Sequence, residues 1–129
     1  MATIPGGQYD DFLTGAHGDD AIHGYGGDDM IFGGHGNDTL VGGTGNDSFL
    51  FTGGGGKDVV MDFTNGDVLQ IAKNINGLNI SSADDVAARV HSDHDGNAVV
   101  DLGHGDTVTL VGVNAEDVHQ DPHGFFKVV

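Results

Sequence analysis

The sequence predicts an all-β fold in which short parallel strands stack coil upon coil, closed at one end by a β-rich segment that contains a short helix. Three observations predict this fold. A nine-residue pattern recurs without interruption through the first part of the chain. Glycine supplies 24 of the 129 residues, whereas a helical protein of this size would favour Glu, Leu and Ala. Cysteine is absent and only 37% of the residues are hydrophobic, so we expect something other than disulfides or a large apolar core to hold the fold together.

The repeat consists of five consecutive nonapeptides at residues 6–50, with three features in constant phase. Each block begins with glycine, at Gly6, Gly15, Gly24, Gly33 and Gly42. The sixth place is aspartate, at Asp11, Asp20, Asp29, Asp38 and Asp47, and the eighth is bulky and apolar, at Leu13, Ile22, Ile31, Leu40 and Phe49. After a two-residue insertion, Phe51–Thr52, a sixth block at 53–61 contains Asp58 and Val60. A low-complexity Gly/Asp tract would not keep the aspartate and the apolar residue in separate phases.

Each block divides into a turn and a strand. Glycine at the first, second and fourth places permits the positive φ values and close backbone approach of tight turns. The last three residues place one apolar side chain between two others, as in a short strand with one inward face. Two blocks therefore make one coil of 18 residues, and successive coils stack their strands in parallel about 4.8 Å apart. Aspartates 18 residues apart become neighbours on one edge, as in the pairs Asp11 with Asp29, Asp29 with Asp47, and Asp20 with Asp38.

Such stacking of carboxylates calls for a cation. Two carboxylates roughly 5 Å apart repel each other by about 3 kcal/mol at an effective dielectric constant near 20. The repeating donors are carboxylates and the carbonyl oxygens of the glycine-rich turns, and these hard oxygen ligands suit Ca²⁺ better than Mg²⁺, which prefers a smaller octahedral site and keeps its waters. The alternative is a solvated acidic surface on an ordinary sheet, but surface acids need no fixed phase with glycine and leucine.

The motif Gly-Gly-x-Gly-x-Asp-x-apolar-x resembles the calcium-binding nonapeptide of the RTX (repeats-in-toxin) family. The blocks at 33–41 and 42–50 match it at every place, and the first blocks depart from it at Tyr9, Ala16 and Tyr25. The resemblance implies a right-handed parallel β-roll with several Ca²⁺ ions held between turns. It implies ligand roles for Asp20, Asp29, Asp38 and Asp47, end positions for Asp11 and Asp58, and carbonyl ligands at Gly15, Gly18, Gly24, Gly27, Gly33, Gly34, Gly36, Gly42, Gly43 and Gly45.

Beyond residue 61 the period stops, and residues 62–129 read as a cap on the repeats of residues 6–61, within one structural unit of residues 1–129. The expected elements are a turn at 62–67, a strand at 68–71, a helix from Ser82 through Arg89, a hairpin of 98–102 with 107–113, and a last strand at 125–129. In the family that the repeats resemble, a segment like 62–67 often follows the last repeat, so Asp62 and Asp67 are either ligands of a terminal Ca²⁺ or parts of a plain turn.

No group of residues in the sequence has the pattern of a catalytic site, and we expect a non-catalytic protein or module. His17 and His35 share the third place of blocks 18 apart and should lie side by side, but a lone pair lacks a third zinc ligand. Residues 93–97 resemble an EF-hand loop, yet the glycine is misplaced and the final Glu is missing, so a hairpin turn is favoured. The sequence has no cysteine and no Gly-x-Ser-x-Gly motif.

The charge limits the partners. With a net charge of −16 and four basic residues, nucleic acid and anionic membranes are poor partners, and no apolar run is long enough for a membrane span. The metal-free chain should stay expanded, so calcium binding and folding should be one event. We expect a monomer without a cleavable N-terminal export signal, because residues 1–7 lack a charged region followed by an apolar one. The resemblance implies an extracellular module of a larger protein, exported by a type I secretion apparatus. The alternative is a calcium-dependent module that binds carbohydrate, such as a polysaccharide, or acts as an adhesin.

Overall fold

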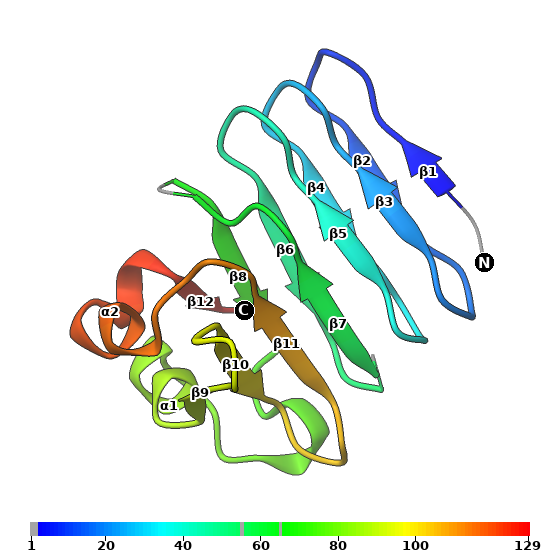
Figure 1. Cartoon of the computed structure of the whole chain (residues 1–129). Coiled ribbons are helices and arrows are strands. Elements are labelled where there is room, and N and C mark those ends of the chain that lie inside the picture. Colours follow the sequence, from blue (N-terminus) through cyan, green and yellow to red (C-terminus); the bar gives the residue numbers. More distant parts are fainter. Residues whose placement is uncertain (1–2, 55, 65) are drawn as a thin grey trace.

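The computed structural model describes residues 3–54, 56–64 and 66–129, which form two sheets of short strands with a few short helices at one end (Figure 1). The strands are β1 (Thr3–Pro5), β2 (Phe12–Thr14), β3 (Ala21–His23), β4 (Met30–Phe32), β5 (Thr39–Val41), β6 (Ser48–Phe51), β7 (Lys57–Val60), β8 (Val68–Ile71), β9 (Val90–Ser92), β10 (Ala98–Asp101), β11 (Thr107–Leu110) and β12 (Phe126–Val128). The helices are η1 (Ile75–Gly77), α1 (Ala83–Ala87), α2 (Ala115–Gln120) and η2 (Pro122–Gly124). Among these residues, no helix is both long and apolar enough to span a bilayer.

The repeats form the predicted parallel β-roll. Alternate strands enter alternate sheets, so β1, β3, β5 and β7 pair in one sheet and β2, β4, β6 and β8 pair in the other. The pairing is parallel and shifted by one coil, since Ile22 lies opposite Leu40 and Ile31 lies opposite Phe49. The first residue of the two-residue insertion, Phe51, lengthens β6 and pairs with Ile71, and after the insertion Leu40 pairs with Val60. In Figure 1 the coils stack in order from the N-terminal end toward the helices.

The core lies between the two sheets. The middle residue of each repeat strand points inward, and Ile22, Ile31, Leu40 and Phe49 are fully buried. Their flanking residues remain partly exposed, as expected for three-residue strands with a single inward face. The buried apolar cluster continues into residues 62–129, where it includes Leu69, Ile71, Val86, Val108 and Val118.

The segment after the repeats extends both sheets. In the smaller sheet, β8 pairs with β6 and β12 pairs with β8, both in parallel. In the larger sheet, β11 adds to β7 in parallel and begins an antiparallel meander through β10 and β9. The hairpin and the final strand were therefore predicted correctly, and the solenoid end is covered by strands rather than by a loop alone.

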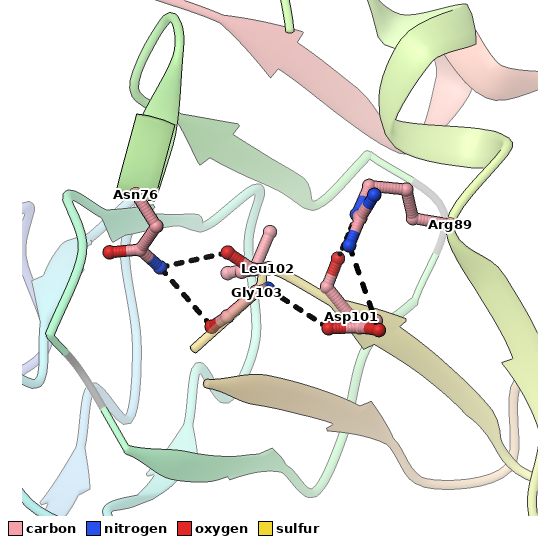
Figure 2. A network of polar contacts seen from close by, with 5 residues as sticks. All are labelled: Asn76, Arg89, Asp101, Leu102 and Gly103. Atoms are coloured by element: carbon pink, nitrogen blue, oxygen red, sulfur yellow. Dashed lines mark hydrogen bonds and ion pairs between the residues drawn. The ribbon is translucent and has the colours of Figure 1, made fainter. Parts of the chain in front are cut away.

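Polar contacts tie this meander to Asn76 of η1 and to Arg89, which directly precedes β9 (Figure 2). The amide nitrogen of Asn76 donates to the carbonyl oxygens of Leu102, at 2.8 Å, and Gly103, at 3.5 Å. Arg89 Nε donates to the carbonyl of Asp101 at 2.7 Å, and its guanidinium lies 3.7 Å from the Asp101 carboxylate. Asp101 Oδ1 in turn accepts from the backbone N–H of Gly103.

Several boundaries differ from the prediction. The helix that starts after Ser82, whose side chain caps the N–H of Asp85, ends at Ala87 rather than Arg89. The sixth repeat strand begins at Lys57, earlier than the repeat phase predicts, because its backbone pairs with β11 from Lys57 onward. The hairpin strands end at Asp101 and Leu110, and the last strand covers only 126–128. The sequence analysis did not predict β1, β9, α2 or the short helices η1 and η2.

Candidate metal centre

The sixth-place aspartates form two ladders, one along each side of the roll, and the expected neighbours lie next to each other. In each ladder the backbone N–H of one aspartate donates to Oδ1 of the aspartate on the next coil. The bonds are Asp11 to Asp29 (2.8 Å), Asp29 to Asp47 (2.9 Å) and Asp47 to Asp67 (2.8 Å) in one ladder, and Asp20 to Asp38 (2.8 Å) and Asp38 to Asp58 (2.9 Å) in the other. All the inner carboxylates are buried, although unpaired buried charges are rare in proteins.

The hydrogen bonding of the second carboxylate oxygen, Oδ2, differs between the first coil and the inner coils. In the first two blocks, backbone N–H groups of Gly7 and Ala16 donate to Oδ2 of Asp11 and Asp20. Among the described residues, Oδ2 of Asp29, Asp38 and Asp47 is buried and has no hydrogen-bond partner. A buried carboxylate oxygen without a partner is costly, so these three atoms require a cation or a proton.

The first-place glycine of each block leaves room for this oxygen. A Cβ on Gly33 would lie 2.6 Å from Oδ2 of Asp38, and a Cβ on Gly15 would lie 2.8 Å from Oδ2 of Asp20. Gly24 and Gly42 face Asp29 and Asp47 in the same way, and the carbonyl oxygen of Gly42 lies 2.6 Å from the position of a Cβ on Gly24. Carboxylate and carbonyl oxygens of adjacent coils therefore share a space that a side chain would fill.

The remaining predicted glycines form the turns. Gly18, Gly27, Gly34, Gly36, Gly43 and Gly45 all have positive φ values, which a residue with a Cβ adopts at a cost. The carbonyl oxygens of Gly18 and Gly27 face the fourth-place glycines of the next coil, Gly36 and Gly45, where a Cβ would collide with them. Where the motif departs from glycine, Tyr25 still adopts a left-handed φ of 66°. The turn carbonyls thus stack in register beside the carboxylates.

Burial sets the protonation of the ladder in the absence of a cation. Burial, followed by the charges of neighbouring aspartates, raises the pKa of Asp38 to about 6 and the pKa of Asp47 and Asp58 to about 7. The pKa of Asp29 is raised as well, again mainly by burial. A bound cation would favour the charged form of each group and would oppose these shifts.

After the insertion, one ladder of aspartates ends at Asp58 and the other ends at Asp67. Asp58 and Asp67 occupy the sixth-place positions of the last coil and accept from Asp38 and Asp47. Oδ2 of Asp67 also accepts from the N–H and hydroxyl of Thr64. Both oxygens of Asp62 accept from backbone N–H groups, those of Gly42 and Gly43. In this arrangement Asp62 and Asp67 hold turns in place, and their role as ligands of a terminal ion stays a prediction.

Asp106 is a buried carboxylate that the sequence analysis did not single out. Its Oδ1 accepts from the N–H of Gly56 at 3.0 Å, and its Oδ2 accepts from Asn76 Nδ2 at 2.9 Å. It joins the hairpin turn of the cap to the last repeat. The sequence did not predict this role, because Asp106 lies outside the repeat phase, in the turn sequence Gly-His-Gly-Asp, where aspartate is a common turn residue. Gly55, in the sixth block, and Asn65, in the 62–67 turn, lie outside the described residues.

The donor set fits a hard cation. In the part of the chain that the structure describes, no three or more His, Asp or Glu side chains gather as a metal cluster, so each site would combine ladder carboxylates with turn carbonyls. These oxygens are the ligands that Ca²⁺ takes in proteins. His17 and His35 do stack, with ring centroids 5.0 Å apart, as predicted. His35 Nδ1 donates to the carbonyl of Gly54.

Comparison with known proteins agrees with the repeat pattern. A sequence profile of the RTX calcium-binding nonapeptide repeat (4 copies) matches residues 3–31 and 18–49. A search of curated protein sequences gave no match. Among solved structures, the solution structure of the AlgE6R3 subunit from a mannuronan C5-epimerase of Azotobacter vinelandii is 26% identical, with 96% of this chain and 80% of that chain covered and a TM-score of 0.38.

Proposed function

We propose that the protein is a module that folds when it binds several calcium ions, on the basis of the match of residues 3–31 and 18–49 to the profile of the RTX calcium-binding nonapeptide repeat. The single observation that carries the proposal is the set of buried Oδ2 atoms of Asp29, Asp38 and Asp47 that have no partner in the described structure. Three such oxygens at the same place of three successive blocks match the spacing of the repeat. An ordinary acidic surface would leave these oxygens in water.

The proposed ligands are the ladder carboxylates together with the turn carbonyls. Asp20, Asp29, Asp38 and Asp47 supply the inner carboxylates, while Asp11 and Asp58 lie at the ends. The carbonyl groups come from the first-, second- and fourth-place glycines of the blocks, as predicted from the motif. The bound ions supply positive charge between coils that would otherwise bring buried carboxylates together without compensation.

Charge explains why binding and folding should be coupled. The chain carries a formal net charge of −16 and 24 glycines, which favour an expanded metal-free state through self-repulsion and backbone entropy. A site held at ten times its dissociation constant stabilises the folded state by about 1.4 kcal/mol, so several linked sites supply the stability of a whole domain.

We further infer that the repeats and residues 62–129 form one structural unit, non-catalytic in itself and part of a secreted protein. The continuous apolar cluster and the extension of both sheets by β11 and β12 support the single unit. A module that folds only with calcium suits type I export, because the chain would stay unfolded where calcium is scarce and fold outside the cell. The C-terminal residues 124–129 resemble the apolar tail of such substrates, except for Lys127.

Calorimetric titration tests the proposed binding. The metal-free chain titrated with Ca²⁺ should bind more than one ion, and the same titration with Mg²⁺ should give at most weak heat, because Mg²⁺ sheds its waters reluctantly. The matched control is one chain that combines the substitutions Asp29→Asn, Asp38→Asn and Asp47→Asn. These substitutions keep the Oδ1 acceptors and remove three negative charges. A control chain that bound as many calcium ions as the unmodified chain would contradict the proposal.

A second role, binding of polysaccharide, is proposed for one surface groove of about 530 Å³. The stacked rings of Phe63 and Phe125 lie in its wall beside Asn114, Asp117 and Asp121. Aromatic rings beside polar oxygens suit neutral sugars, while the two carboxylates oppose uronates unless calcium bridges the charges. Titration with neutral and uronate oligosaccharides, with and without calcium, separates the two cases. Absence of binding in both would remove this role.

A further inference from the structure

The fifth place of each block carries a polar side chain that the calcium proposal does not use. These residues are Asp10, Asp19, Asp28, Asn37, Asn46 and Lys57. All six are exposed, whereas the sixth-place aspartate next to each of them from Asp20 onward is buried. The family motif leaves this place open.

The fifth-place side chains form their own ladder between coils. Oδ1 of Asp10 accepts from the N–H of Asp28 at 2.7 Å, and Oδ1 of Asp28 accepts from the N–H of Asn46 at 2.8 Å. On the other side of the roll, the N–H of Asn37 donates to Oδ1 of Asp19 and the N–H of Lys57 donates to Oδ1 of Asn37, both at 2.8 Å. Each bond joins one coil to the next at the same place of the repeat.

This ladder runs in the direction opposite to the sixth-place ladder. The fifth-place Asp28 accepts from a later coil, through Asn46, while the adjacent Asp29 accepts from an earlier coil, through Asp11. Neighbouring residues therefore hold a coil to both of its neighbours. A slip of one residue would break both sets of bonds and would turn the strand's inward side chain outward.

The acceptor oxygen, not the charge, is common to the fifth places of the first five blocks. Asn37 holds the N–H of Lys57 at the same 2.8 Å at which Asp19 holds the N–H of Asn37. On the side of Asp19 and Asn37 the ladder ends at Lys57, whose side chain has no acceptor oxygen, and there Asp106 of the cap accepts from the N–H of Gly56. The acceptors thus cover the repeat coils and stop where the cap begins.

We propose that the fifth-place side chains are positioning residues for calcium binding: their neutral or charged oxygens fix the coil register that aligns the sixth-place carboxylates. The inference rests on the proposed function and deepens it. The charge of the fifth-place residue is dispensable, and its acceptor oxygen is required.

Four substitutions in the full chain separate the acceptor from the charge. Asp28→Asn and Asn37→Asp keep Oδ1 and change only the charge, whereas Asp28→Leu and Asn37→Leu remove the acceptor with little change in size. The measurement is the calcium concentration at the midpoint of the β-type circular dichroism signal. We expect both leucine variants to raise the midpoint by roughly tenfold, as expected when a backbone donor loses its partner, and the two swaps to shift it by less than about threefold.

Two results would overturn the inference. If Asp28→Asn raised the midpoint as much as Asp28→Leu, charge and not the acceptor would be the contribution of this place. If neither leucine variant moved the midpoint, the ladder would have no part in binding. A failure of the unmodified chain to respond to calcium at all would instead contradict the proposed function, so the two failures are distinguishable.

A further pair of variants keeps the test valid if the inner leucine variants do not fold. Asp10 lies in the exposed first coil and accepts only from Asp28 among the bonds described here, so Asp10→Leu should leave the other coils in place. In the calcium-loaded protein, the amide of Asp28 should exchange with solvent at least about tenfold faster in Asp10→Leu than in Asp10→Asn. Equal exchange rates in the two variants would contradict the role of the acceptor.

Discussion

The backbone N–H of Asp38 donates a 2.9 Å hydrogen bond to Oδ1 of Asp58, although these residues are 20 apart in sequence and the equivalent pairs before them are 18 apart. The insertion Phe51–Thr52 therefore leaves the ladder intact. Oδ2 of Asp38 remains buried without a partner, and burial raises the pKa of both carboxyl groups. This is a place where the metal-free fold carries a clear electrostatic cost.

Replacing Asp38 should harm calcium binding more than replacing Asp11. Asp38→Ala removes a buried carboxylate and leaves the N–H of Asp20 without its acceptor, which costs about 1–3 kcal/mol before any lost ligand is counted. Asp11 lies in the partly exposed first coil, and its Oδ2 already accepts from Gly7. In a calcium titration followed by circular dichroism, we expect the midpoint to rise at least about tenfold for Asp38→Ala and less than about threefold for Asp11→Ala. Equal midpoints would contradict the ordering.

A methyl group on Gly33 should block the inner site. Its Cβ would lie 2.6 Å from Oδ2 of Asp38, and Gly33 does not have a positive φ, so the effect would come from lost space and not from backbone strain. Gly7→Ala is the matched control, because its Cβ would meet only Oδ2 of Asp11, at 3.9 Å. Calorimetry should show fewer bound calcium ions for Gly33→Ala and an unchanged number for Gly7→Ala. A full complement of ions in Gly33→Ala would argue against this location.

Calcium affinity should fall as the solution becomes more acidic. In the metal-free fold the pKa is raised to about 6 for Asp38 and to about 7 for Asp47 and Asp58. The pKa of these groups is 3.8 in the unfolded chain, so the raised pKa values stabilise the metal-free fold relative to that chain. This stabilisation is complete below pH 3.8 and is lost as the pH rises through 6 to 7. At acid pH the protonated metal-free fold competes with the expanded chain, and calcium must displace those protons from the fold, so its apparent affinity should be at least about tenfold lower near pH 5.5 than near pH 8.

Calorimetry in two buffers of different ionisation enthalpy measures the protons released on binding. Near pH 6 we expect net proton release from the chains that are folded and protonated before calcium binds, and near pH 8.5 we expect almost none. A calcium affinity that did not change with pH, together with no proton release near pH 6, would contradict the competition between calcium and the protonated metal-free fold.

Asp106 should stabilise the junction without affecting the number of ions. Asp106→Ala leaves Gly56 N–H and Asn76 Nδ2 without this acceptor, and we expect the calcium-loaded protein to lose about 1–3 kcal/mol of unfolding free energy. Chemical denaturation in saturating calcium measures the loss, and calorimetry should show the same stoichiometry as in the unmodified chain. A reduced stoichiometry would instead place Asp106 among the ligands.

The roll was largely predictable because one rule repeats. Since Asp29 and Leu40 stand in fixed phase with the glycines, one block fixes the position of every other, and the register of 18 residues follows. The buried oxygens at Asp29, Asp38 and Asp47 follow from the same period, although the hydrogen bonds of the ladder needed coordinates. The alternating direction of the fifth- and sixth-place bonds is a property of paired coils and cannot be read from one block.

The cap was less predictable because no period constrains it. The helix at 115–120 has a capping Asn114 and two acids in its first turn, yet it is too short for hydrophobic periodicity to reveal it. β1 precedes the first complete block and was missed because only its pairing with β3 identifies it. The bonds of Asp106 join residues 50 and 30 apart in sequence, and such contacts leave no local signal.

The most direct test of the central claim is the fold of the chain after exhaustive removal of metal. The far-ultraviolet circular dichroism spectrum at neutral pH should lose its β-type signal in a strong chelator, should regain it in excess Ca²⁺, and should not regain it in Mg²⁺ at the same concentration. A compact β-type spectrum that persists after all metal has been removed would contradict the account.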